Sequence, residues 1–150
     1  MRLPAAGRAR RPRTRRRDRR IVRHGFEITG GAHAPRDARM AVQAAVGDRL
    51  DPTASHDLRL LVSEVVTNSV RHGGAGPSRA VTLTVTLFPS AVRVEVAGPH
   101  GGFDPPPAAL DPAGTSGRGL TLLGLLSTRW GVGLGPPGTV WFEMSPRRRS

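Results

Sequence analysis

Two neighbouring segments of the chain alternate apolar and polar residues with a period of two. Residues 80–88 alternate valine and leucine with threonine, and residues 91–96 alternate valine with Arg93 and Glu95. Such alternation is typical of strands that bury one face of a sheet. The short Pro-Ser link between the two segments predicts a hairpin. Three further strands are expected over residues 21–28, 130–134 and 139–144.

Other segments repeat apolar residues at the spacing of an amphipathic helix. The most regular one stops at Gly73-Gly74, and either Thr53 or Ser55 is expected to cap its first turn. Pro35 suits the first turn of the preceding helix. The apolar stripe of that preceding helix is expected to consist of Met40, Ala41, Ala44, Ala45 and Leu50. The expected helices cover residues 35–50, 54–72 and 120–128.

Together these elements predict an α+β fold, a two-layer sandwich of helices on a mostly antiparallel mixed sheet. A chain of 150 residues is long enough for one such domain, which we expect over residues 24–146. The Gly- and Pro-rich segment 98–116 is long for a loop in a compact domain, and loops of that length are often functional. Residues 147–150 form a basic C-terminal tail.

The formal net charge of +12 is concentrated at the N-terminus. Residues 1–23 hold eleven of the 23 arginines and one acid, whereas residues 24–146 hold nine arginines and ten acids. We expect the Arg-rich tail to be disordered, because it has too few large apolar groups to offset the entropy of ordering. Nucleic-acid binding is therefore expected only through this tail, by charge alone.

Composition narrows the remaining classes of function. The chain has no cysteine, which excludes disulfides and thiolate metal sites and suits a reducing cytoplasm. Its apolar runs are too short to span a bilayer, and no apolar segment of a secretory signal follows the basic N-terminus. We therefore expect a cytoplasmic protein that does not bind membranes.

The most informative motif lies in the second expected helix. Glu64 and Asn68 are four residues apart, so their side chains lie one turn apart on one side of that helix, about 40° from each other around its axis. An amide oxygen that ligates magnesium, next to a carboxylate that accepts a proton, suits phosphoryl transfer from a nucleotide. Taken alone, the pair is more typical of the solvated edge of an amphipathic helix.

The order of the motifs gives this pair its context. After the helix come Arg71-His72-Gly73-Gly74, two strands, Gly101-Gly102-Phe103-Asp104-Pro105, Gly117-Arg118-Gly119-Leu120 at a helix start, and the closing strands. This order resembles the ATPase domain of anti-sigma-factor serine kinases, within the gyrase, heat-shock-90, histidine-kinase and MutL superfamily. The resemblance covers residues 26–144 and implies a Bergerat-type ATP-binding fold.

The resemblance also implies roles for individual residues. Glu64 would be the general base toward a protein serine or water, and Asn68 the magnesium ligand. Gly117 and Gly119 would let the backbone approach the ATP phosphates at a helix N-terminus. The other nucleotide-binding positions would be His72, Gly98, Gly102, Leu120 and Thr139, with Thr139 near the adenine.

One position departs from the family pattern. Where the family has an Asp that accepts a hydrogen bond from the adenine amino group, this chain has Gly98, and His100 stands where the first glycine of that motif is expected. Two hypotheses therefore stay open. The chain is either an ATP- and magnesium-dependent serine kinase that binds a sigma factor and phosphorylates its antagonist, or a non-catalytic protein-binding module without tight ATP binding. The resemblance implies a homodimer in addition.

Overall fold

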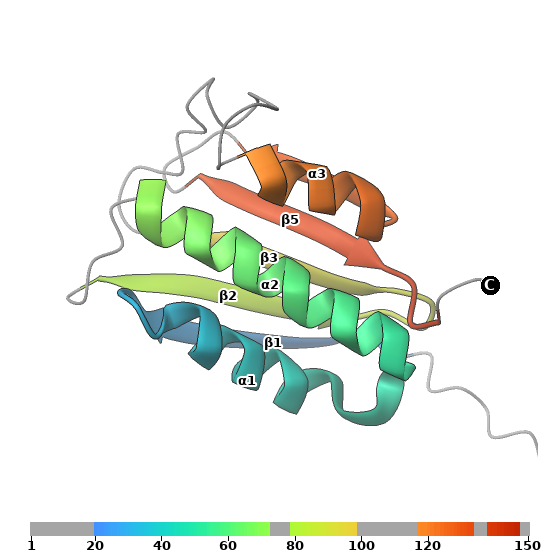
Figure 1. Ribbon diagram of the computed structural model, residues 1–150. Coiled ribbons are helices and arrows are strands. Elements are labelled where there is room, and N and C mark those ends of the chain that lie inside the picture. The colour runs from blue at the N-terminus through green and yellow to red at the C-terminus, as the bar shows by residue number, and fades with distance from the viewer. Residues whose placement is uncertain (1–19, 73–78, 99–116, 134–137, 148–150) are drawn as a thin grey trace, which may run out of the picture.

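The computed structural model describes residues 20–72, 79–98, 117–133 and 138–147. They form three α-helices, a short 3₁₀ helix and five strands (Figure 1). In chain order the elements are β1 (Val22–Thr29), α1 (Ala34–Val46), η1 (Gly47–Arg49), α2 (Pro52–His72), β2 (Ala80–Leu87), β3 (Val92–Ala97), α3 (Gly117–Leu126), β4 (Arg129–Gly133) and β5 (Thr139–Met144).

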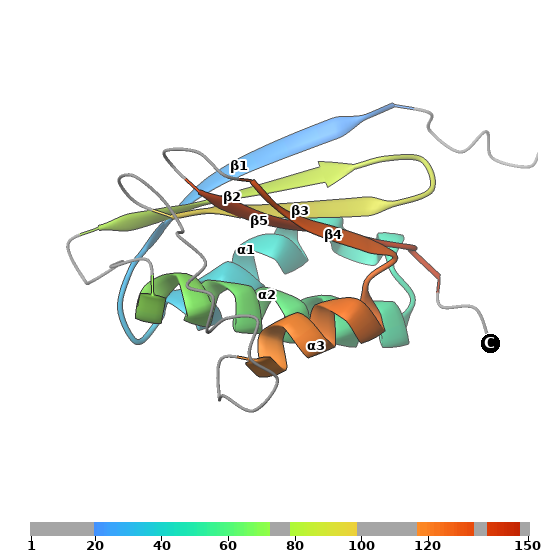
Figure 2. The same ribbon diagram turned by 90° about the horizontal axis from the view of Figure 1, so that it is seen from above.

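The strands form one sheet in the order β1-β2-β3-β5-β4. All four pairings between these described strands are antiparallel, so the parallel pair of a mixed sheet is not found among them. The three α-helices cover the same face of the sheet (Figure 2). The α+β two-layer sandwich is thus confirmed.

The core lies between the helix layer and the sheet, and the strand alternation decides which side chains enter it. Thr82, Thr84 and Thr86 point to the open face, while the valines and leucines between them are buried. The same alternation continues in β3 and β5. The buried strand residues are Ile28, Val81, Leu83, Val85, Leu87, Val92, Val94, Val96, Val140, Phe142 and Met144.

The predicted apolar stripe of α1 was wrong in part. Met40 is 62 % exposed and Ala44 is also exposed. Both lie about 160° from Val42, the residue at the centre of the buried side. The side of α1 that packs on the core consists of Ala34, Ala38, Val42 and Val46. The sequence does not determine which side of α1 faces inward, because small apolar residues occur on several sides of this helix. The packing of α1 on the sheet determines which row is buried.

The predicted cap of α2 was also wrong. Asp51, rather than Thr53 or Ser55, caps this helix, because its Oδ1 accepts a hydrogen bond from the backbone N–H of Ala54 at 2.7 Å. Pro52 follows as the first helical residue. A backbone N–H at this position would have no partner within the helix, so proline, which lacks it, loses no hydrogen bond there. Ser55 lies inside the helix, and its hydroxyl donates to the side-chain oxygen of Gln43.

The remaining boundaries differ from the predicted ones by a few residues. Strand β1 begins at Val22, so it includes the last two residues of the expected tail and starts before residue 24. Helix α3 begins three residues earlier than expected, at Gly117, and ends at Leu126. Strand β5 covers the predicted residues 139–144.

The open face of the sheet carries a charged cluster around an indole ring. Arg93 contacts Glu143 at 3.1 Å, and Arg129 contacts the same carboxylate at 2.8 Å. The Arg93 guanidinium lies 4.0 Å from the centre of the Trp141 ring, a cation–π contact. Burial alone would raise the pKa of Glu143, but hydrogen bonds and charges from the two arginines outweigh it and lower that pKa.

Candidate functional site

Glu64 and Asn68 lie on the side of α2 that faces α3. Both side chains are half-buried, at the border of the buried stripe. Asp57, two turns before Glu64, lines a cavity together with Leu125 and Leu126 of α3. Residues 57, 64 and 68 fall within about 40° of one another around a helix axis, so they share this side. The carboxylate and the amide predicted to act together therefore face the same neighbouring helix.

The direction of α3 places its glycines at the same end of the domain. Helices α2 and α3 contact each other and run in opposite directions (Figures 1 and 2). The N-terminus of α3, with Gly117 and Gly119, therefore lies toward the half of α2 that carries Asn68. Free backbone N–H groups and the helix dipole at such a terminus favour phosphate. This end of the helix layer thus holds the groups expected for a nucleoside triphosphate and a cation.

The adjoining ends of β3 and β5 carry glycine on the side that faces the helices. Gly98 is buried, continues the inward-facing row of Val94 and Val96, and donates its N–H to the carbonyl of Gly138 at 3.2 Å. Gly138 is also buried, next to the start of β5. The position where an Asp would meet the adenine therefore faces inward, as strand parity predicts, but carries no side chain.

Thr139 does not face this region. Val140 points toward the helices, so Thr139 points to the open face, where it pairs with Ala97 and its hydroxyl lies over Gly133. This side chain is therefore turned away from the face that the helices cover, and its contact with an adenine stays a prediction. The signal was present in the alternation of β5, because the inward row is Val140, Phe142 and Met144.

For two of the other expected positions the structure describes the backbone, and a third lies outside the described residues. His72 is the last residue of α2, and Leu120 lies in the first turn of α3. Gly102 falls outside the described residues.

Two polar residues of α2 lie among its buried side chains. Asp57 is buried, with only 6 % of its surface exposed, and its spacing of seven from Glu64 could have revealed it. Ser69 is fully buried, and its hydroxyl has no hydrogen-bond partner among the described residues. Its helical spacing with Val62, Val65 and Val66 predicts this burial, because these residues recur on one side of the helix.

These residues fit a nucleotide with magnesium better than a metal alone. Magnesium prefers hard oxygen ligands and commonly combines one or two protein groups with phosphate oxygens. Within the described part of the chain, no group of three or more histidine, aspartate or glutamate side chains could hold a metal ion. Asn68 and Glu64 would therefore meet a cation that phosphate oxygens also ligate.

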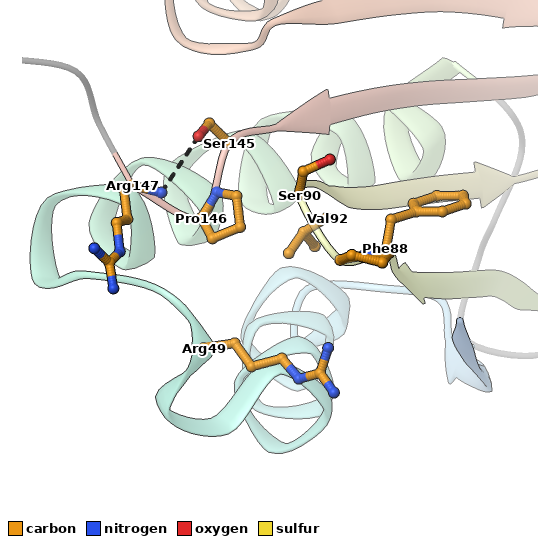
Figure 3. Close-up of a pocket in the computed structure, with 8 residues that line it drawn as sticks. Arg49, Phe88, Ser90, Val92, Ser145, Pro146 and Arg147 are labelled. Carbon is orange, nitrogen blue, oxygen red and sulfur yellow. Dashed lines mark hydrogen bonds between the residues drawn. The ribbon is translucent and has the colours of Figure 1, made fainter. Parts of the chain in front are cut away.

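A separate cavity of about 430 Å³ lies at the other end of the sheet (Figure 3). Its lining includes Arg49, Arg147, Val92 and Phe88. The N–H of Asp51 holds this end together by donating to the carbonyl of Pro146 at 3.1 Å. Among the residues that the structure describes, none of the predicted nucleotide-binding positions lines this cavity.

The fold and the site define an ATPase domain of the superfamily that the motif order indicated: helices on one face of an antiparallel sheet, with Glu64, Asn68 and a glycine-containing helix start at one end. The family model of the histidine kinase-like ATPase domain matches residues 31–140, and the chain belongs to this family. No curated protein matches the chain. No helix in the described segments is both long and apolar enough to cross a membrane.

Proposed function

We propose that this chain binds ATP with magnesium and acts as a regulator that binds a sigma factor and phosphorylates a serine of an antagonist protein. The observation that carries the proposal is the placement of Glu64 and Asn68 on the α3-facing side of α2, toward the N-terminus of α3. Family membership supports the nucleotide. The sigma factor and the antagonist rest on the resemblance to anti-sigma-factor kinases, whereas a cytoplasmic location rests on the composition of the chain, which has no cysteine.

Each group has one task in this proposal. The Asn68 side-chain oxygen would ligate the cation, and the N–H groups at the start of α3 would bind phosphate. The Glu64 carboxylate accepts the proton of the attacking serine hydroxyl. Bound magnesium would neutralise the charge that develops on the transferred phosphoryl group.

A second candidate is a non-catalytic protein-binding module. The observation that favours it is the pair of buried glycines, Gly98 and Gly138, at the sheet end where a carboxylate would meet the adenine amino group. Such a hydrogen bond contributes about 1.5–3 kcal/mol, so its absence lowers the affinity for ATP by about 10- to 150-fold. A partner surface on the same fold would not need the nucleotide.

Calorimetry with ATP and magnesium tests nucleotide binding. We expect the wild type to release heat at millimolar nucleotide and Asn68→Ala to bind more weakly in magnesium. The matched control is Thr67→Ala, because Thr67 is a half-buried neighbour about 100° away on the same helix. Absence of heat with the wild type would remove the ATP proposal and favour the binding module.

Phosphoryl transfer is tested with labelled ATP, magnesium and a candidate antagonist protein. We expect transfer with the wild type and a loss of about 100-fold or more with Glu64→Gln, which keeps the size of the side chain but cannot accept the proton. Nucleotide binding by the variant should be retained. Binding without transfer, or equal transfer by Glu64→Gln, would refute the kinase role while leaving ATP binding in place.

A further inference from the structure

Ser69 carries a fully buried hydroxyl that has no hydrogen-bond partner among the described residues. Two other serines at helices show the usual arrangement, because the hydroxyls of Ser63 and Ser127 each donate to the backbone carbonyl four residues earlier. Ser69 makes no such bond to the carbonyl of Val65. A buried polar group without a partner is rare in a folded protein and calls for an explanation, and a ligand atom is one such explanation.

The hydroxyl lies on the sheet-facing side of α2, at the end of the domain where the nucleotide-binding residues are predicted. Ser69 is in line with Val62 and Val66, which are fully buried, and it belongs to the last turn of the helix. It is about 100° around the helix axis from Asn68. Figure 1 shows this last turn at the same end as the start of β5, which follows Gly138. Asn68 thus faces α3, whereas Ser69 faces the sheet.

The sheet brings no polar side chain to this place among its described residues. Gly98 and Gly138 are both buried, and the hydrogen bond that joins them uses only backbone atoms. The next inward residues on the same two strands are Val96 and Val140, which are buried and apolar. A base that enters between α2 and the sheet would therefore meet the Ser69 hydroxyl rather than a carboxylate.

This exchange of a carboxylate for a hydroxyl changes which base can be bound. Adenine carries an amino group, a donor, where guanine carries a carbonyl oxygen, an acceptor. An ionised carboxylate only accepts hydrogen bonds, so it pairs with the adenine amino group and repels the guanine oxygen. A hydroxyl both donates and accepts. Ser69 can therefore accept a hydrogen bond from the amino group of adenine or donate one to the oxygen of guanine.

We infer that the nucleotide site does not discriminate between adenine and guanine, and that the Ser69 hydroxyl is the group that meets either base. The inference rests on the proposed binding of a nucleotide with magnesium. It names purine nucleoside triphosphates, rather than ATP alone, as the substrate class. The predicted phosphate and cation groups, Asn68 and the start of α3, would serve both nucleotides in the same way.

Calorimetry of the full chain in magnesium tests this inference with three ligands: ATP, GTP and inorganic triphosphate, which has no base. We expect the wild type to bind ATP and GTP with affinities within about tenfold of each other, because the same hydroxyl forms one hydrogen bond with either base. Inorganic triphosphate reports on the phosphate and cation groups alone.

Ser69→Ala separates contact with the base from a merely structural role. The variant should bind ATP and GTP more weakly by similar factors, about 3- to 10-fold, and bind inorganic triphosphate as the wild type does. Without a ligand its Tm should rise, because the hydroxyl has no described partner. A merely structural role would change the Tm but not the affinities.

The matched control is Ser55→Ala, the same change on the same helix. Ser55 lies fourteen residues earlier, about 21 Å along the helix axis, and its hydroxyl donates to the side chain of Gln43. This variant should bind all three ligands as the wild type does.

Gly98→Asp should restore discrimination between the two bases. The introduced carboxylate can accept from adenine and repels the guanine oxygen, so the ratio of ATP affinity to GTP affinity should rise by about tenfold or more over that of the wild type. Affinity for inorganic triphosphate should not rise, because the carboxylate is placed for the base.

A wild-type preference of more than tenfold for either purine nucleotide would overturn the inference and leave nucleotide binding in place. So would a Ser69→Ala variant that binds ATP and GTP as tightly as the wild type. Absence of heat with both ATP and GTP would refute the proposed nucleotide binding and the inference together.

Discussion

Gly98→Asp should have opposite effects on the free protein and on its complex with ATP. Residue 98 is buried on the inward row of β3, beside Val96, which is fully buried. Its N–H already donates to Gly138, and this backbone bond does not depend on the side chain. An introduced carboxylate therefore faces the helix layer. Without a ligand it lacks a partner, and burying such a polar group costs about 1–3 kcal/mol.

The same carboxylate gains a partner when the adenine amino group is present. A charge-assisted hydrogen bond of about 1.5–3 kcal/mol corresponds to an increase in affinity for ATP of about 10- to 150-fold. Thermal unfolding of Gly98→Asp without nucleotide should therefore occur below the wild-type Tm. With ATP and magnesium, its shift in Tm should exceed that of the wild type. Calorimetry gives the affinities directly.

The control for this change is Ala97→Asp. Residue 97 is half-buried on the open face, so a carboxylate there points away from the helix layer and should leave ATP affinity unchanged. If Gly98→Asp folds but binds ATP no more tightly than the wild type, residue 98 does not face the adenine. An equal gain for Ala97→Asp would show that the inferred faces of β3 are wrong.

Three further changes test the packing of the domain. Ser69→Ala should raise the free energy of unfolding by about 1–2 kcal/mol, because it removes a buried hydroxyl without a described partner and adds helix propensity. A loss of stability in urea unfolding would show that the hydroxyl makes a hydrogen bond. Glu143→Gln should lower the free energy of unfolding at neutral pH, and this difference from the wild type should disappear as the pH falls below 4.5. The reason is that a carboxylate with a lowered pKa stabilises the fold only at a pH where it is ionised. An equal difference at neutral and at acidic pH would contradict the ion pairs. Gly131→Ala should lower the free energy of unfolding by about 1–3 kcal/mol, since a Cβ there would lie 2.8 Å from the Trp141 ring. The control is Gly25→Ala, which has open space around it and should be neutral or slightly stabilising in the same urea titration.

The elements with a strong local signal could be predicted from the sequence. The alternation of β2 and β3 places the buried residues correctly, because successive strand residues must point to opposite faces. The spacing of Glu64 and Asn68 predicts a shared side of α2 for the same kind of reason. Parity also predicts that residue 98 faces inward, as its burial confirms.

Contacts between elements decided the rest. The inward row of α1 depends on where the helix meets the sheet, and Met40 was misplaced because apolar residues occur on more than one side of that helix. The direction of α3 relative to α2, which brings its N-terminus toward Asn68, is likewise a property of packing.

The sequence alone determined that this chain has the residues of a histidine kinase-like ATPase domain and that Gly98 replaces a carboxylate. The tertiary structure decided which of them face one another. It turned Thr139 to the open face, set Gly138 beside Gly98, and left the β1 edge unpaired by any described strand. The physical reason is that local periodicity fixes which residues share a face, whereas only the packing of helices on the sheet fixes which face is covered.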